Sequence, residues 1–156
     1  MRRKDRGITD SAKIEAILQR CTCCRVGFWD GKEVYIVPLN FGYEKTDGSY
    51  TLFFHGAKEG RKIDLIERYP HVGFEMDTDF ALQQAEIACG FSARFLSIIG
   101  NGEIAIVTDP AEKLHGLACI MKHYTGKDDW TYNEKMLDAT AVFRIRVTEL
   151  CGKEHE

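Results

Sequence analysis

The sequence has 156 residues, of which 44% are hydrophobic and 29% are charged. This length and balance are typical of one globular domain, so we expect a single domain over residues 1–156. The formal net charge of −3 gives the whole protein no electrostatic attraction to nucleic acid or to an anionic membrane. Any anionic ligand would therefore have to be held by a local cluster of cations.

No stretch of the sequence resembles a signal peptide, because the charged first residues are not followed by an apolar segment. The longest apolar runs fall far short of the ~20 residues that cross a membrane. We therefore expect a cytoplasmic protein whose partners include neither a membrane nor nucleic acid.

The cysteines of the chain are six in number: Cys21, Cys23, Cys24, Cys89, Cys119 and Cys151. In a reducing cytosol they are not a disulfide framework. Residues 21–24 contain one C-x-x-C pair, and His115, Cys119 and His123 share one face of a predicted helix, so a zinc site is one interpretation. The other interpretation is that the cysteines are small core residues and the histidines border a helix face. We expect the second arrangement and no metal ion.

The first predicted elements are a helix and a hairpin. Apolar residues at helical spacing predict a helix over residues 11–20, with Thr9 or Asp10 as its N-cap. Two β-rich runs follow at residues 24–29 and 34–43. The Asp30-Gly31 pair between them is a strong hairpin signal.

The middle of the chain is predicted to alternate between strands and one short helix. Residues 50–54 form a strand after a turn at residues 46–48, and residues 59–69 form a helix that ends before Pro70. Strand character resumes at residues 72–76.

Two further strands, residues 95–99 and 103–107, are expected to join through a turn at Gly100-Asn101-Gly102. Asp109-Pro110 then begins a helix that reaches about Tyr124, because Pro is favoured at the first helical position. The apolar stripe of this helix is predicted to be Leu114, Leu117, Ala118 and Met121. Residues 140–148 form the last predicted strand.

Strands dominate this pattern, and the helices do not alternate regularly with them. That favours an antiparallel barrel with helices on its outside over a Rossmann sheet. The absence of a G-x-G-x-x-G motif agrees with this choice.

The clearest candidate site is the step from strand to helix at residues 53–62. A helix N-terminus offers unpaired N–H groups and partial positive charge, and Gly56 and Gly60 allow a ligand close to the backbone. Lys58, Arg61 and Lys62 add three cations. Together these features fit a phosphate group, although a solvated helix start would show the same pattern.

A second candidate lies within residues 35–43, where Pro38 stands in the middle of a predicted strand. Proline removes one hydrogen bond of the ladder and indicates an edge strand or an interrupted one. An interrupted strand leaves backbone groups free to bind a ligand, and Asn40 adds a side-chain donor and acceptor. The alternative is an edge strand whose Pro38 only prevents pairing.

In combination these two stretches resemble the flavin-binding split-barrel proteins related to pyridoxamine 5′-phosphate oxidase, and most closely their nitroimidazole-resistance (Nim-type) branch. The resemblance runs from about Asp5 to about Lys153 and is carried by residues 34–43, 52–64, 95–103 and 107–113. The combination of His-Gly-Ala-x-x-Gly-Arg-Lys with the strand Val-Pro-Leu-Asn-Phe-Gly-Tyr is specific.

The resemblance implies a mainly β fold with peripheral helices, a six-stranded split barrel of the FMN-binding type. It also implies a homodimer with one flavin mononucleotide (FMN) in each of two clefts between the subunits. Arg61 and Lys62 match the family's phosphate-binding positions, and His55 matches the active-site histidine of Nim-type proteins. The implied cofactor-binding residues are Val37, Pro38, Leu39, Asn40, Phe54, His55, Gly56, Lys58, Arg61, Lys62 and Ser97.

One departure from the family lies at Phe95-Leu96-Ser97-Ile98, where the family often has Tyr-Arg-Ser-Val. Ser97 keeps the implied cofactor contact, whereas the loss of Tyr and Arg puts a substrate contact there in doubt. Trp29 and Trp130 are candidate walls for the flavin ring, or ordinary core or interface residues.

The leading functional hypothesis is an FMN-dependent oxidoreductase that reduces a small organic compound, with nitroaromatic or nitroimidazole compounds as candidates. His55 would serve as the proton donor. A flavin carrier or sensor without turnover is the alternative. A pyridoxamine-phosphate oxidase proper is disfavoured because the sequence has no clear second cationic cluster for the phosphate of that substrate.

Overall fold

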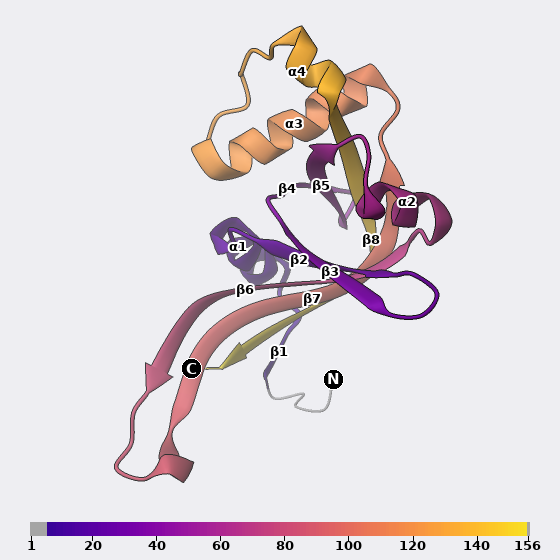
Figure 1. Ribbon diagram of the computed structural model, residues 1–156. Coiled ribbons are helices and arrows are strands. Elements are labelled where there is room, and N and C mark those ends of the chain that lie inside the picture. The colour runs from indigo at the N-terminus through magenta and orange to yellow at the C-terminus, as the bar shows by residue number, and fades with distance from the viewer. Residues whose placement is uncertain (1–5, 156) are drawn as a thin grey trace.

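The computed structural model describes residues 6–155, which form one antiparallel sheet flanked by helices (Figure 1). The strand order is β3-β2-β6-β7-β8-β5-β4, and β1 pairs with β8. The strands are β1 (Gly7–Ile8), β2 (Cys24–Trp29), β3 (Val34–Leu39), β4 (Gly42–Thr46), β5 (Ser49–Ala57), β6 (His71–Gln83), β7 (Ser92–Ile106) and β8 (Thr140–His155). The mainly β fold with peripheral helices is confirmed, with eight strands in the described part instead of six.

The helices are α1 (Ser11–Arg20), α2 (Arg61–Arg68), α3 (Pro110–Thr125) and α4 (Glu134–Ala139), and a 3₁₀ turn spans Ala88–Gly90. Asp10 and Asp109 are N-caps, because their carboxylates accept hydrogen bonds from the N–H groups of Lys13 (2.9 Å) and Glu112 (2.8 Å). The starts of α1 and α3 were predictable for this reason. Among residues 6–155 no helix is long and apolar enough to cross a membrane.

The predicted strand over residues 34–43 is divided into two strands. β3 ends at Leu39 and pairs with β2, whereas β4 begins at Gly42 and pairs with β5 at the other end of the sheet. A Cβ atom on Gly42 would overlap the backbone of Cys119, so the chain passes directly beneath α3 at this point. β3 is an edge strand, which is where Pro38 can be accommodated without the loss of a ladder hydrogen bond.

The predicted turn at Gly100-Asn101-Gly102 is wrong, because β7 runs through it without interruption. A Cβ atom on Gly100 would overlap the ring of Phe74, and one on Gly102 would lie 2.5 Å from the carbonyl oxygen of Arg146. The register between β7 and β8 shifts between Asn101 and Gly102. These glycines therefore allow a bulge and close packing inside a strand.

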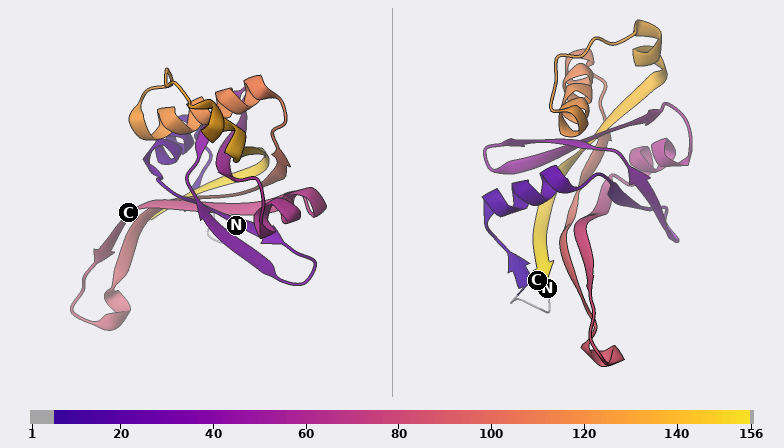
Figure 2. Two further views of the ribbon diagram at one scale, coloured as in Figure 1. Left: turned by 45° about the horizontal axis from the view of Figure 1, so that its top comes forward. Right: turned by 90° about the vertical axis from the view of Figure 1, so that its left-hand side faces the viewer.

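β6 and β7 form a long hairpin that projects from the body of the protein as an arm (Figures 1 and 2). Both strands extend well beyond the segments predicted for them. Large hydrophobic side chains are exposed near the tip, with exposed fractions of 44–69%: Phe80, Leu82, Ile87 and Phe91. Exposed apolar groups in such number are typical of a contact surface.

The buried side chains form two clusters. The larger one fills the space between the sheet and helices α1 and α2 and includes Phe28, Phe41 and Phe143. The smaller one lies beneath α3 and includes Phe53 and Leu117. The predicted stripe of α3 is partly wrong, because Leu114 is exposed and the helix buries Gly116, Leu117 and Ile120.

Candidate functional site

The cationic segment predicted as a phosphate site, residues 55–62, runs from the end of β5 into the first turn of α2. We call it the cationic turn. Gly60 is the N-cap of α2 with a φ angle of +119°, a conformation that favours glycine, and no side chain caps the helix. The N–H groups of Ile63 and Asp64 bond to the carbonyl of Gly60. Because the N–H groups of Arg61 and Lys62 precede them in the first turn, they remain available to an anion.

Lys62 lies directly behind this turn and is half-buried. Its Nζ atom is 5.0 Å from the ring centre of Phe143, and an ideal Cβ on Gly56 would lie 2.8 Å from Nζ. Burial lowers the pKa of Lys62. Within residues 6–155 no carboxylate forms an ion pair with it. A partly desolvated ammonium group without a counter-charge is an arrangement that an anionic ligand would stabilise.

Arg61 is placed differently. Its Nη2 atom donates hydrogen bonds to Asp30 (2.7 Å) and Glu33 (3.2 Å) in the turn between β2 and β3. The guanidinium group also lies 4.5 Å from the ring centre of Tyr35. Arg61 therefore fastens α2 to the β2–β3 hairpin and would have to leave two carboxylates to bind a phosphate. Lys58 is exposed on the loop before the helix.

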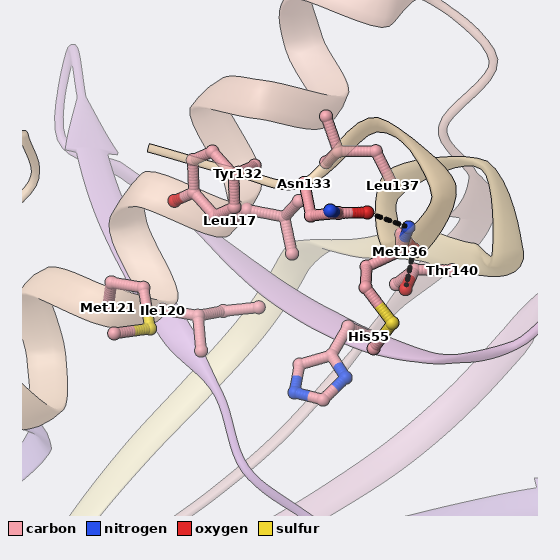
Figure 3. A pocket seen from close by; sticks show the side chains of 9 residues that line it. All are labelled: His55, Leu117, Ile120, Met121, Tyr132, Asn133, Met136, Leu137 and Thr140. Carbon is pink, nitrogen blue, oxygen red and sulfur yellow. Dashed lines mark hydrogen bonds between the residues drawn. The ribbon is translucent and has the colours of Figure 1, made fainter. Parts of the chain in front are cut away.

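His55 lies at one wall of an apolar cavity of about 180 Å³ between β5 and helices α3 and α4 (Figure 3). The other lining residues are Leu117, Ile120, Met121, Tyr132, Asn133, Met136, Leu137 and Thr140. His55 is exposed at the edge of this cavity, where partial desolvation lowers its pKa and the positive charge of Lys62 lowers it further. The cavity and the candidate phosphate site are therefore electrostatically coupled through these two side chains.

The far wall of this cavity comes from α4, which sequence reasoning missed. Asn133 caps the helix by accepting a hydrogen bond from the N–H of Met136 (3.3 Å), and Thr140 Oγ1 donates to the carbonyl of Met136 (2.7 Å). Both bonds are drawn in Figure 3. Asn133 followed by Glu134 is an N-cap signal, but a helix of six residues has too little periodicity to reinforce it.

The predicted ring-binding strand alternates between the core and solvent. Val37 and Leu39 pack against the core, whereas Pro38 on the edge strand and Asn40 just after it are exposed. The side chain of Phe54 is fully buried and stacks on Phe143 at 5.6 Å between ring centres. Only the backbone of Phe54 is therefore available to a ligand.

Ser97 lies farther along the sheet than the residues of the cationic turn. Phe143 on β8 pairs with Phe54 on β5, directly before the cationic turn, and with Ile106 on β7. Ile106 is therefore the residue of β7 that lies level with the cationic turn. Ser97 lies nine residues before Ile106, which corresponds to about 30 Å of strand. Ser97 therefore lies toward the arm, well along β7 from the level of the cationic turn.

The two tryptophans are both 46% exposed. Trp29 lies on the outer face of the sheet beside Val34, and the indole N–H of Trp130 donates to the carbonyl of Lys127 at 3.1 Å. Neither residue lines the cavity beside His55.

The buried cysteines behave as core residues. Cys21 and Cys24 are fully buried, and burial raises the pKa of the Cys21 thiol to about 12. His123 Nε2 donates a hydrogen bond to the carbonyl of Cys21 at 2.8 Å and is not directed at its sulfur. The interpretation of Cys21 and Cys24 as core residues is confirmed, and no disulfide joins any of the six cysteines.

Comparison with known proteins identifies the family. Residues 10–154 match the model of the pyridoxamine 5′-phosphate oxidase family. The chain belongs to this family. The match covers nearly the whole chain, so both the cationic turn and the cavity beside His55 lie inside the shared region. No curated protein matches the sequence.

Solved structures of the split-barrel type resemble this family member. A Bacteroides thetaiotaomicron protein named for 5-nitroimidazole antibiotic resistance is 34% identical, with a TM-score of 0.81 over 95% of this chain and 86% of that one. A flavocytochrome from Azotobacter vinelandii has a TM-score of 0.82 at 21% identity, over 100% of this chain and 72% of that one. An FAD and heme binding protein from Mycobacterium smegmatis has a TM-score of 0.81 at 16% identity, over 97% and 74%. These two share the fold, and the split-barrel prediction is confirmed.

Proposed function

We propose that this member of the pyridoxamine 5′-phosphate oxidase family binds FMN with its phosphate at the N-terminus of α2, and uses it to reduce a small organic compound. The observation that carries the proposal is the half-buried ammonium group of Lys62, which no carboxylate pairs among the described residues, next to an uncapped helix start. A phosphate dianion would satisfy both features at once.

The choice of substrate class rests on similarity. The Bacteroides thetaiotaomicron relative is named for 5-nitroimidazole antibiotic resistance, which makes nitroaromatic compounds the first class to test. Several structural relatives are named as flavin-containing or FAD-binding proteins, which supports a flavin. FMN is the form whose single terminal phosphate fits one cationic turn.

The residues around the turn have separate roles in this proposal. The first N–H groups of α2 and the ammonium of Lys62 hold the phosphate, and exposed Pro38 and Asn40 contact the edge of the ring system. The apolar cavity beside His55 holds the organic substrate, to which His55 donates a proton. The flavin, when bound, supplies the electron-transfer chemistry.

The flavin would lie between two subunits of a homodimer. Outward-facing side chains of the sheet form an exposed apolar surface with exposed fractions of 46–62%: Trp29, Val34, Ile36 and Ile99. Ser97 lies on this same face, because it alternates with buried Ile98. Since about 30 Å of strand separates Ser97 from the level of the turn in its own chain, we assign its flavin contact to the cofactor held by the partner subunit.

A flavin carrier or sensor is the second candidate. The lowered pKa of His55 favours it, because an imidazole that is neutral near pH 7 is a poorer proton donor than its cation. In a carrier the cavity would bind the flavin ring or a partner group without turnover. The two candidates differ in the outcome of a single kinetic measurement.

The experiment begins with the absorption spectrum of the purified full chain and the mass of any released chromophore. We expect a yellow protein, or tight uptake of added FMN. Turnover of a nicotinamide cofactor with a nitroimidazole acceptor then distinguishes the enzyme from the carrier.

The variant His55→Ala should keep its flavin and lose about 10²- to 10⁴-fold in activity. A colourless protein that takes up no flavin would contradict the proposal, and full activity in His55→Ala would remove that residue from the mechanism.

A further inference from the structure

A second cluster of reactive side chains lies where α3 crosses β4. His115 and Cys119 are one turn apart on α3, and Glu44 lies on β4 beneath them. His115 Nε2 is 2.6 Å from Glu44 Oε2 and 3.6 Å from Cys119 Sγ. One ligand atom from each residue lies within 4.8 Å of the other two. An imidazole, a thiol and a carboxylate thus converge on one point.

This convergence is close to the geometry of a zinc site. Zinc binds sulfur at about 2.3 Å and nitrogen or oxygen at about 2.0–2.2 Å, so a tetrahedral site separates nitrogen from sulfur by about 3.6 Å and nitrogen from oxygen by about 3.4 Å. The observed separation between His115 Nε2 and Cys119 Sγ already has this value. The Glu44 oxygen is 2.6 Å from His115 Nε2 and would have to retreat to about 3.4 Å, a change that rotation of a half-exposed side chain permits.

The surroundings of the cluster favour a cation. The three residues line a hollow of about 620 Å³, in which Lys45 is paired with Glu15 (2.9 Å) and Lys122 with Asp128 (3.1 Å). A divalent cation bound here would displace the thiol proton of Cys119, because zinc binds the thiolate.

We propose that Glu44, His115 and Cys119 bind one Zn²⁺ ion, with the fourth coordination position open to the hollow. The mixture of sulfur, nitrogen and oxygen ligands suits zinc better than magnesium or calcium. The ion would fasten α3 to β4. This site is distinct from the flavin site, because the cavity beside His55 contacts Leu117, Ile120 and Met121 on another face of α3.

The test uses the untagged full chain with its flavin bound, after treatment with a chelator. Zn²⁺ is added, and metal content is measured after gel filtration and in competition with a chromophoric chelator. We expect one Zn²⁺ per chain in the parent protein. Loss of an outer-shell partner already costs about 10- to 100-fold in metal affinity, so Cys119→Ser, His115→Ala and Glu44→Gln should each lose at least about 100-fold. Their flavin content should not change.

Cys23→Ser is the matched control, because Cys23 is a half-exposed cysteine outside the cluster. This variant should retain the parent affinity for Zn²⁺. A second measurement needs no variant: Zn²⁺ should protect Cys119 from alkylation, and exposed Cys89 should react equally with and without the ion. Three outcomes would overturn the proposal: no uptake of Zn²⁺, uptake that survives His115→Ala, or uptake that is lost in Cys23→Ser. After any of these outcomes, the contact between His115 and Glu44 would be interpreted as a hydrogen bond without a metal ion.

Discussion

Arg61 and Lys62 are adjacent cations in different surroundings, and this difference predicts how each affects ligand binding. A charge-assisted hydrogen bond contributes about 1.5–3 kcal/mol, and about 1.4 kcal/mol corresponds to a factor of ten in affinity. Lys62→Met should therefore weaken FMN binding by roughly 10- to 100-fold. Arg61→Met should weaken it less, because Asp30 and Glu33 already bind the guanidinium.

Fluorescence titration of both variants with FMN and with riboflavin checks this prediction. Riboflavin lacks the phosphate, so its affinity should change little in either variant. A larger loss of FMN affinity in Arg61→Met would show that Arg61 exchanges its carboxylate partners for the phosphate. Equal losses for both ligands would show that neither cation contacts the phosphate.

The titration of His55 gives a second prediction for the same site. Partial desolvation and the charge of Lys62 hold its pKa below about 6.5 in the flavin-free protein. Either a phosphate bound at Lys62 or the substitution Lys62→Met should raise this pKa. Nuclear magnetic resonance titration of the imidazole in the free, FMN-bound and riboflavin-bound protein measures the shift. A pKa that is the same in all three states would separate His55 from the phosphate site.

The lowered pKa of His55 also makes the free energy of unfolding depend on pH. As the pH falls below about 6.5, the unfolded chain binds a proton at this residue before the folded chain does, so the free energy of unfolding decreases. Above about pH 6.5 both states are neutral there, and this contribution to the pH dependence disappears. His123, whose pKa burial also lowers, acts in the same direction.

At the scale of elements, Gly42 decides how closely α3 approaches the sheet. A Cβ atom there would overlap the backbone of α3, which cannot move as a flexible side chain would. Gly42→Ala should therefore lower the free energy of unfolding by about 1–3 kcal/mol, the usual cost of overpacking. Gly73→Ala is the control, because its Cβ would make only an ordinary contact at 3.5 Å. Urea denaturation compares the two, and equal stabilities would contradict the prediction.

The elements that sequence analysis predicted well are those fixed by local signals. Asp10 and Asp109 cap helices, and Asp30-Gly31 forms a hairpin turn, because these preferences depend on neighbouring residues only. The break in the chain before Gly42 and the unbroken strand at Gly100–Gly102 were not predicted because their cause is tertiary: these glycines make room for distant elements. The length of the β6–β7 arm was also missed, since its outer part lacks a buried face to impose alternation.

The candidate site was predictable to a similar extent. The cationic turn follows from residues 55–62 alone, because glycine, lysine and a helix start are visible in sequence. The partners of Arg61 are about 30 positions away, and the wall opposite His55 comes from α4. Neither fact has a local signal, so the sequence could not distinguish Arg61 from Lys62 or reveal the cavity.

For the whole molecule, the exposed outer face of the sheet and the arm predict a homodimer. Ile99 is 52% exposed on this face, so Ile99→Glu should leave the subunit folded and place a charge in the interface. Light scattering of the flavin-loaded parent should give a dimer mass, and this variant should shift toward monomer. Leu114→Glu is the control, because Leu114 is 43% exposed on α3, away from that face. A parent protein that binds flavin as a monomer would contradict the prediction.

The expectation of one domain over residues 1–156 stays a prediction.

The position of β8 within the sheet has a consequence for how the protein reaches this structure. Residues 140–155 are the last strand in sequence, yet they lie between β7 and β5. β8 joins two groups of strands, β3-β2-β6-β7 on one side and β5-β4 on the other. Until β8 has been synthesised, no strand connects these two groups. During synthesis the earlier strands must therefore remain with unpaired edges, and the pairs that join β5 to β8 range from Ala57 with Thr140 to Thr51 with Arg146, which are 83 and 95 positions apart. Such non-local pairing is slow, and strand edges that are still unpaired are sites of aggregation until residues 140–155 are inserted.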